Sequence, residues 1–338
     1  MHVTIVGAGV AGLTCAVELA ERGVEVEVLE RADALGAGSC GWYAGGMLAP
    51  WCERESSEEL IATLGEESID WWASRLPGLV VREGTLVVAH GRDAMDLASF
   101  ARRTSRCIAV DRDRIGILEP ELAGRFQHAL FFPSEAHLDP RAALFALADR
   151  LTALGVHIRY GAAHASRTSS TDRMIVDCRG LAARDVLTDL RGVRGEMMLL
   201  RQPELSLRRP VRVLHPRVPL YIVPRGDGLF MVGATMIESD ERRGITARSA
   251  LELLSAAYAL HPAFGEAEIV ETGTGVRPAF ADNLPHLCWR DGVLYVNGLY
   301  RHGFLLAPAL ARRAAETILD HRSFPEVMDE DPRQRRLA

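Results

Sequence analysis

The chain alternates between short apolar runs and longer segments in which apolar residues recur at helical spacing. It opens with an apolar run at Val3–Val6, a helical pattern over Leu13–Ala20 and a second apolar run over Val24–Leu29. This order predicts a strand, a helix and a parallel strand. Near the end of the chain, a strand at Val293–Val296 precedes a helical pattern over about Phe304–Leu319. We therefore expect the two ends of the chain to share one domain.

The first half of the remaining chain predicts a mixture of helices and strands. Helical spacing covers Ser57–Trp72 and Ala94–Thr104, and a third helix is expected from Pro140 to about Leu154. Asp139 would cap that third helix, because Pro140 suits its first position. The strands expected here are Thr85–Ala89, Val156–Tyr160 and Met174–Asp177.

From Gly195 onward the pattern changes to short apolar runs separated by turns. One helix, around Ala250–Leu260, interrupts them. The strands expected in this part are Met197–Leu200, Val211–Leu214, Leu220–Val223, Leu229–Val232 and Ile269–Gly273. Such a series predicts an antiparallel sheet, inserted into the domain that the two ends of the chain form.

A glycine motif joins the first predicted strand to the first predicted helix. Gly7, Gly9 and Gly12 have the spacing G-x-G-x-x-G, and Glu30 follows at the end of the second strand. The first glycine permits a tight turn, the second lets the backbone approach a pyrophosphate, and the third allows close packing of helix and strand. Glu30 could accept both hydroxyls of an adenosine ribose and would repel a 2′-phosphate. The alternative is a glycine-rich turn in another kind of α/β protein, and the motif alone does not separate NAD from FAD.

Composition narrows the classes of function. The 338 residues are 48% hydrophobic and carry a net charge of -6, which favours a protein of two domains and no nucleic-acid partner. No apolar run reaches about 18 residues, and a strand at the start leaves no room for a signal peptide, so a cytoplasmic location without a membrane span is expected. The six cysteines are scattered, which predicts neither a metal site nor disulfides. The chain has no lysine, which excludes Schiff-base and Walker-A chemistry.

Several segments, in their order and spacing, resemble the FAD-dependent amine oxidases of the D-amino-acid oxidase family, and most closely those of the glycine oxidase type. The segments that carry this resemblance are Gly7–Gly12 with Glu30 and Arg31, Ala44–Pro50, Asp177–Gly180, Arg191–Glu196, Tyr221–Arg225, Val232–Met236, Gly275–Pro278 and Gly298–Pro308. The resemblance implies an α/β fold with a Rossmann-like FAD-binding domain and an inserted antiparallel substrate domain. The FAD-binding domain would comprise residues 1–80, 138–186 and 270–338, and the substrate domain 81–137 and 187–269.

The resemblance also assigns the residues that would bind FAD. The loop from Ala44 to Met47 would run along the flavin, and Gly298 and Gly303 would flank a second loop beside the ring. The helix that follows would direct its positive end at the flavin. The complete set is Gly7, Gly9, Val10, Ala11, Gly12, Glu30, Arg31, Ala44, Gly45, Gly46, Met47, Gly180, Gly298, Arg301, His302, Gly303, Phe304 and Leu305. Cys288 does not match the position of the cysteine that binds flavin covalently in related sarcosine oxidases, so noncovalent FAD is expected.

On the substrate side the resemblance places three residues with catalytic roles. Arg277 would bind the carboxylate of an amino acid through two hydrogen bonds, or else form a structural salt bridge. Arg301 would be a second arginine of the site, unless it pairs with a carboxylate of the protein. Tyr221 would line the site and donate to the substrate carboxylate, or pack as a strand tyrosine. Met236 and Met47 would line the substrate pocket or serve packing alone.

The activity that the resemblance implies is oxidative deamination of glycine or another small amino acid or amine. Hydride would pass from Cα to flavin N5, and O2 would be the acceptor and give H2O2, with the product supplying the thiazole branch of thiamine biosynthesis. No acid–base residue is required for this step. Two alternatives stay open, namely a D-amino-acid dehydrogenase with a quinone or carrier as acceptor, and a flavoprotein of tRNA modification. The oligomeric state is open, a homo-oligomer included.

Overall fold

The computed structural model describes residues 1–90, 94–162, 173–214 and 220–329. A seven-stranded sheet has the order β18-β16-β17-β9-β1-β2-β8. Its strands are β1 (His2–Val6), β2 (Glu25–Leu29), β8 (Ile158–Arg159), β9 (Arg173–Asp177), β16 (His286–Arg290), β17 (Val293–Asn297) and β18 (Met328–Asp329). Strands β17, β9, β1, β2 and β8 are parallel, whereas β16 and β17 form an antiparallel pair. Both ends of the chain therefore contribute to this sheet, as the sequence predicts.

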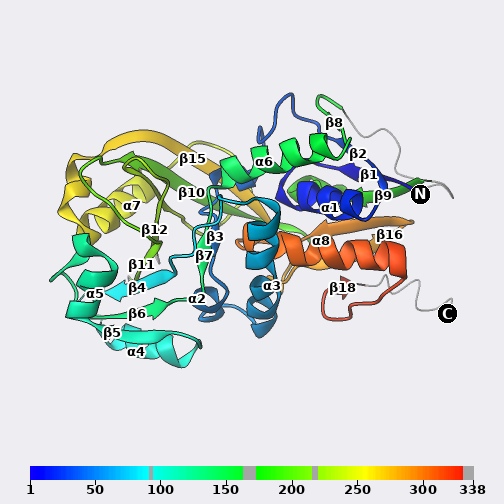
Figure 1. The fold of residues 1–338 in the computed structure, drawn as a ribbon. Coiled ribbons are helices and arrows are strands. Elements are labelled where there is room, and N and C mark those ends of the chain that lie inside the picture. Colours follow the sequence, from blue (N-terminus) through cyan, green and yellow to red (C-terminus); the bar gives the residue numbers. More distant parts are fainter. Residues whose placement is uncertain (91–93, 163–172, 215–219, 330–338) are drawn as a thin grey trace.

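Four helices pack with this sheet in the larger of the hydrophobic cores. They are α1 (Val10–Glu21), α3 (Glu59–Arg75), α6 (Pro140–Ala153) and α8 (Gly303–Asp320), as Figure 1 shows. The predicted cap of α6 is confirmed, because the Asp139 carboxylate accepts hydrogen bonds from the backbone N–H groups of Arg141 and Ala142. The core is filled by aliphatic and aromatic side chains of β1 and of the facing sides of the helices, which is the arrangement that their spacing predicts.

A nine-stranded sheet forms the other half of the molecule (Figure 1). Its strands are β4 (Thr85–Ala89), β5 (Ile108–Asp111), β6 (His128–Phe132), β10 (Arg191–Arg201), β11 (Val211–Leu214), β12 (Leu220–Pro224), β13 (Leu229–Gly233), β14 (Ile237–Glu238) and β15 (Glu268–Ala279). All pairs except β4 with β11 are antiparallel. The helices in this half are α4 (Ala94–Arg102), α5 (Arg112–Leu118) and α7 (Ala247–Leu260). The predicted α/β fold with an antiparallel sheet inserted in it is confirmed.

Strand β15 is longer than its apolar pattern suggests. It pairs with β10 from Glu268 to Ala279, which places it in the nine-stranded sheet. The sequence pattern predicts only its first half, because the second half of β15 contains glycine, threonine and arginine, whose polar and small side chains give no apolar alternation. The seven-stranded sheet resumes at β16. The boundaries of the two domains stay a prediction.

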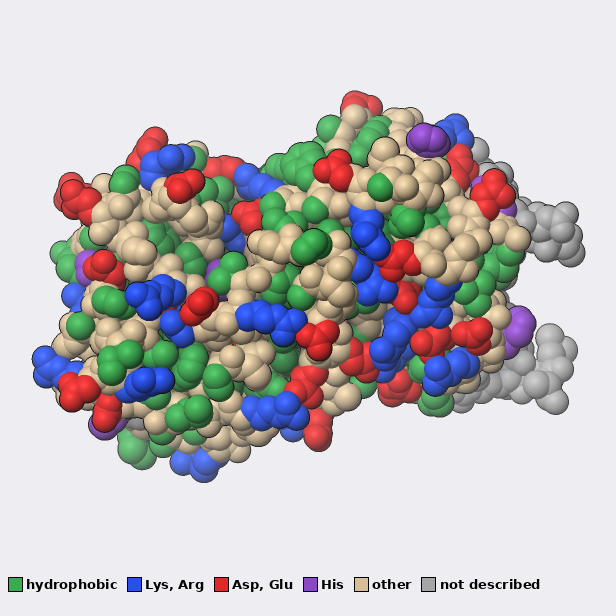
Figure 2. Space-filling model, viewed as in Figure 1, with side chains coloured by type: hydrophobic (Ala, Val, Ile, Leu, Met, Phe, Trp, Pro, Cys, Tyr) green, Lys and Arg blue, Asp and Glu red, His purple; other side chains and the backbone are tan. Residues whose placement is uncertain are grey.

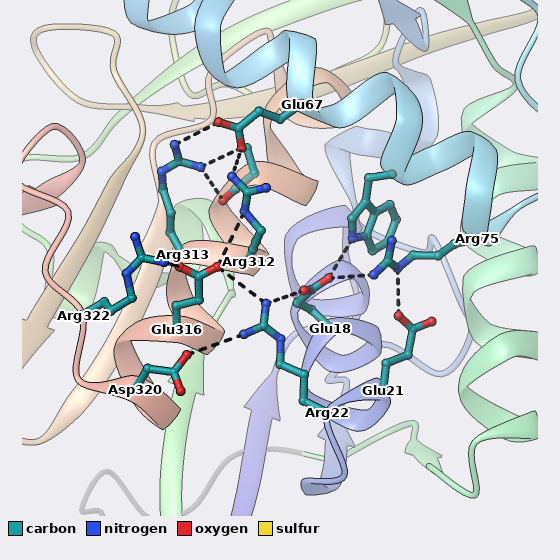
Figure 3. Close-up of polar contacts among 12 residues, drawn as sticks. Glu18, Glu21, Arg22, Glu67, Arg75, Arg312, Arg313, Glu316, Asp320 and Arg322 are labelled. Carbon is teal, nitrogen blue, oxygen red and sulfur yellow. Dashed lines mark hydrogen bonds and ion pairs between the residues drawn. The ribbon is translucent and has the colours of Figure 1, made fainter.

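Helices α1, α3 and α8 are joined by a cluster of ion pairs, shown in Figure 3. The buried carboxylate of Glu18 lies 2.7 Å from Arg22 and 3.3 Å from Arg75, and it accepts a hydrogen bond from the Trp71 indole at 2.8 Å. On α8, Arg313 pairs with Glu67 of α3 at 3.0 Å. Figure 2 shows basic and acidic side chains side by side on the surface of this region. These pairs fix the mutual orientation of three helices that come from distant parts of the sequence.

Candidate active site

A cavity of about 490 Å3 is lined by residues of both sheets and of the loops between them. All of the predicted site residues except Gly12 and Gly298 line it. Those that do are Gly7, Gly9, Val10, Ala11, Glu30, Arg31, Ala44, Gly45, Gly46, Met47, Gly180, Tyr221, Met236, Arg277, Arg301, His302, Gly303, Phe304 and Leu305. The structure thus brings together segments from the start, middle and end of the chain, and the roles of these residues stay predictions.

The N-termini of α1 and α8 both open on the cavity. Neither helix has a side-chain cap, and the first residues of each, Val10 and Ala11 or Gly303 and Phe304, line the cavity. Backbone N–H groups of an uncapped first turn have no partner within the helix and carry the positive end of its dipole. Two such termini in one cavity suit a ligand with phosphate groups at one end and an electron-accepting ring at the other.

The glycine turn before α1 is built for close approach. A Cβ atom at Gly7 would stand 2.8 Å from the carbonyl oxygen of Cys178, and Gly7 has a φ of 103°. A Cβ atom at Gly12 would stand 1.8 Å from the carbonyl oxygen of Gly7, so Gly12 serves the packing of helix against turn and does not line the cavity. Both positions require glycine for the reasons that the motif implies.

Glu30 lies at the end of β2 with its carboxylate directed to the glycine turn. Its two oxygens accept hydrogen bonds from the backbone N–H groups of Ala8, at 2.7 Å, and Ala32, at 2.8 Å. Each oxygen keeps a second lone pair, so Glu30 can also accept the hydroxyls of a ribose. Together with the glycine turn and the helix termini, these residues fit an ADP-bearing cofactor such as FAD.

Arg225, which directly follows β12, holds the loop from Ala44 to Gly46 in place. The buried guanidinium donates to the carbonyl oxygens of Ala44 at 3.0 Å, Gly45 at 2.8 Å and Leu138 at 2.7 Å. Burial lowers the pKa of Arg225 to about 10, which still leaves it a cation at neutral pH. Gly46 has a φ of 70°, and a Cβ atom there would stand 2.1 Å from the carbonyl oxygen of Leu138. The loop therefore has one fixed course along the cavity.

Arg277 projects into the cavity from β15. Its Nη1 donates to the carbonyl oxygen of Thr235 at 3.1 Å, and within the described part of the chain no carboxylate lies close enough to form an ion pair with it. Burial lowers the pKa of Arg277 from its ordinary value, but an arginine stays protonated at neutral pH. A cation that is partly buried and has no anionic partner is well suited to bind an anion.

Tyr221 and Arg301 meet at a carboxylate that sequence reasoning missed. Glu53, which is 7% exposed, accepts a short hydrogen bond from the Tyr221 hydroxyl and forms an ion pair with Arg301 at 2.8 Å. Arg212 donates to the same hydroxyl oxygen at 2.9 Å and pairs with Glu55 at 3.1 Å. The proton of Tyr221 is therefore directed to Glu53 in this arrangement, and Arg301 takes the alternative of pairing with a carboxylate of the protein.

Two arginines and a hydroxyl stabilise the charged form of Glu53. Burial alone would raise the pKa of this carboxyl, but Arg301, Arg212 and the hydrogen bond from Tyr221 help to lower it to about 2. Burial lowers the pKa of His302 to about 3, so the ring is neutral at physiological pH. Its Nε2 accepts a hydrogen bond from Nε of Arg301 at 3.3 Å, which leaves the proton on Nδ1 toward Glu53. His302 is thus a neutral part of the cavity wall, and its predicted role in binding FAD stays a prediction.

A short helix, α2 (Pro50–Arg54), carries Glu53 to the cavity. Its backbone N–H at Cys52 donates to the fully buried carboxyl of Glu135 at 2.7 Å. Burial raises the pKa of Glu135 to about 8, so this carboxyl is protonated at neutral pH. Proline at the first position of α2 and the carboxyl at its N-terminus together fix the start of the helix.

Glu53, Arg212 and Arg225 carry no sequence signal of their own. A five-residue helix is too short to show periodicity, and an arginine in an apolar strand has many explanations. The sequence does contain one indication of the short helix that carries Glu53, because Pro50 stands three residues before it and proline often starts a helix. Gly298 has a φ of 75° and lies against Phe280 outside the cavity lining, and its predicted place beside the flavin stays a prediction.

Two features are not found in the part of the chain that the structure describes. No group of three or more His, Cys, Asp or Glu side chains there could hold a metal ion. No helix among these residues is long and apolar enough to span a membrane.

The model of a protein family described as FAD dependent oxidoreductase matches residues 2–317. ThiO of Rhizobium etli, named as a thiamine biosynthesis oxidoreductase, is 57% identical over 326 residues, which cover 96% of this chain and 99% of that protein. Glycine oxidase of Pseudomonas aeruginosa is 26% identical and is matched over 93% of this chain and 94% of its own. The crystal structure of glycine oxidase from Geobacillus kaustophilus shares the fold with a TM-score of 0.79 at 24% identity, covering 96% of this chain and 95% of that one. The chain therefore belongs to the FAD dependent oxidoreductase family, and it is an enzyme of the glycine oxidase and D-amino-acid oxidase type.

Proposed function

We propose that the protein oxidises glycine or another small amino acid or amine, with O2 as the acceptor and H2O2 as a product. The observation that carries this proposal is Arg277, a partly buried cation in the cavity wall that has no carboxylate partner among the described residues. An amino acid supplies the missing anion. The 57% identity to a protein named for thiamine biosynthesis supports a product that serves the thiazole branch of that pathway.

Arg277 orients the substrate in this proposal. Two parallel hydrogen bonds from a guanidinium to a carboxylate fix both the position and the plane of the carboxylate. When bound, FAD supplies the two-electron acceptor for the Cα–H bond. Gly45 and Met47 border the same cavity, so the substrate and the ring would share one enclosed space.

Bulky side chains narrow the space near Arg277, so this space suits glycine better than a larger amino acid. Met236, Tyr300 and Arg301 contact one another, with the Met236 sulfur 3.6 Å from the Tyr300 hydroxyl and 3.5 Å from the Arg301 guanidinium. Met236 is 46% exposed and so lies at the solvent side of the cavity. A larger amino acid would have to displace this group.

The test is an anaerobic panel of amines read by flavin bleaching, followed by re-oxidation in air. We expect glycine and small amines to bleach the flavin and to yield one H2O2 per amine oxidised. Arg277→Ala should retain FAD and lose substrate affinity. Rapid dye reduction without peroxide would overturn O2 as the acceptor and favour a dehydrogenase, and the absence of bleaching by every amine would overturn the amine oxidation.

We also propose that FAD is held without a covalent bond. Cys288 is fully buried in β16 and does not line the cavity. Cys40 does line it, but burial raises the pKa of its thiol, which lowers the fraction of reactive thiolate. Acid precipitation should release all of the flavin into the supernatant, and flavin that stays with the pellet would contradict noncovalent binding.

A further inference from the structure

Glu53 brings a negative charge into the part of the cavity where the substrate is expected to bind. The other charged side chains that line this part are arginines, namely Arg212, Arg242, Arg277 and Arg301. A carboxylate here is unfavourable for a site that binds a carboxylate, because like charges repel. Its presence therefore calls for an explanation beyond packing.

The contacts of Glu53 join two of the predicted substrate residues. One oxygen accepts from the Tyr221 hydroxyl, and the other lies 2.8 Å from Nη2 of Arg301 and 3.6 Å from Nδ1 of His302. Arg301 has further contacts with the hydroxyls of Ser56, at 2.6 Å, and Ser57, at 3.5 Å. These contacts draw the Arg301 guanidinium toward α2 and fix its position relative to Tyr221.

Pairing of the charges leaves one cation without a partner. Glu53 neutralises Arg301, and Glu55 at 3.1 Å neutralises Arg212. His302 and Tyr221 are neutral at physiological pH, since burial lowers the pKa of the ring and raises that of the phenol. Arg242 is exposed to solvent, where its charge is screened. The net charge that the enclosed part of the site presents is that of Arg277 alone.

We infer that Glu53 is a specificity-determining and positioning residue: by neutralising Arg301, it leaves Arg277 as the single uncompensated cation, so that the site selects amines with one carboxylate over amines with two. This inference rests on the proposed amine oxidation. A second carboxylate could pair only with the guanidinium of Arg301, which already forms an ion pair with Glu53. Without the charge of Glu53, the site would hold two free cations and would favour a dianion.

The experiment measures how tightly the FAD-loaded protein binds carboxylates that cannot be oxidised as amines. Glycolate carries one carboxylate, and malonate and succinate carry two. Dissociation constants are taken from titration calorimetry and from the change in flavin absorbance, for the parent, Glu53→Gln, Arg301→Gln and the double variant. Glu58→Gln is the matched control, because it removes the same charge from the exposed start of α3, and Glu58 does not line the cavity.

The expected results follow from the charge of each variant. Glu53→Gln should shift the preference toward the dianions by at least about tenfold, because one elementary charge about 10 Å from a carboxylate changes its binding by more than a factor of ten at an effective dielectric constant of about 20. Arg301→Gln leaves Glu53 unpaired and should weaken glycolate binding by a similar factor. The double variant restores the net charge and should return to near the parent's preference, and Glu58→Gln should leave the preference unchanged.

A purely structural role for Glu53 predicts a different outcome. The double variant would then bind all three ligands at least as poorly as either single variant, and this result would overturn the inference. If Glu53→Gln fails to fold, the double variant still decides, because it leaves no unpaired charge. Kinetics with the amine panel, iminodiacetate included, separate the two proposals: a parent enzyme that oxidises none of these amines contradicts the proposed function, whereas amine oxidation with an unchanged preference in Glu53→Gln contradicts this inference alone.

Discussion

Gly195 of β10 lies directly against the guanidinium of Arg277 of β15. A Cβ atom at Gly195 would stand 2.2 Å from Nη2 of Arg277, in a register that pairs Gly195 with Gly275. The missing side chain of Gly195 is therefore what lets Arg277 cross the neighbouring strand and reach the cavity. The position of the expected carboxylate anchor depends on a glycine more than 80 residues earlier in the chain.

Gly195→Ala should displace Arg277 and weaken substrate binding. We expect the KM for glycine to rise by at least about tenfold, because two charge-assisted hydrogen bonds lose their geometry. FAD content should stay that of the parent. Gly244→Ala is the control, since a Cβ atom there meets nothing within 4 Å. An unchanged KM in Gly195→Ala would show that Arg277 does not bind the carboxylate.

Arg225→Met should weaken FAD binding and spare the overall fold. The substitution keeps much of the side-chain volume and removes the donors that hold the carbonyl oxygens of Ala44 and Gly45. Hydrogen bonds to a charged group contribute about 1.5–3 kcal/mol, so the dissociation constant of FAD should rise about tenfold or more. Titration of the apoprotein with FAD measures it, with the exposed Arg201→Met as the control. Unaltered affinity would mean that the loop keeps its course without Arg225.

Glu135→Gln should change how stability depends on pH. Burial raises the pKa of Glu135 to about 8 from 4.5, so the folded chain holds a proton that the unfolded chain releases between these values. The stability of the parent therefore falls as the pH rises from about 4.5 to 8. The amide cannot ionise, so the variant should gain stability relative to the parent between pH 5 and pH 9. Urea unfolding at several pH values tests it, and a constant difference would contradict the protonated carboxyl.

Glu18→Gln should destabilise the fold more than the loss of an exposed ion pair. Glu18 is 5% exposed and contacts Arg22, Arg75 and the Trp71 indole. Loss of its charge should lower the free energy of unfolding by about 1–3 kcal/mol, as expected for buried hydrogen bonds to a charged group. Arg322→Gln, whose side chain is 60% exposed, should cost less than about 1 kcal/mol. If urea unfolding shows the same loss of stability for Glu18→Gln and Arg322→Gln, burial does not determine how much an ion pair of this cluster contributes.

The sequence predicts the parts of the molecule that follow a local rule. The glycine turn at Gly7, the cap at Asp139 and the strands of both sheets obey such rules, because a turn, a helix terminus and an alternation of apolar residues each depend on neighbours in the chain. The residues at the flavin loop and at Arg277 came from family resemblance, and the structure gathers them in one cavity.

The charges that surround the substrate end could not be predicted in this way. Glu53 meets Tyr221 across 168 residues and Arg301 across a longer separation, and no periodic pattern records such a contact. Arg225 likewise holds a loop about 180 residues away. Interactions of this kind depend on how the two sheets join, which is a property of the folded molecule and not of any segment.

The N-termini of α1 and α8 meet in one cavity, although the two helices come from opposite ends of the chain. Their packing is direct, since the Thr14 hydroxyl of α1 donates to the carbonyl oxygen of Ala307 of α8 at 3.4 Å, across 293 positions. During synthesis on the ribosome, the cavity predicted to bind the cofactor therefore stays incomplete until α8 has been made. A ligand that binds only the form in which the two helices are packed adds its binding free energy to the stability of that form.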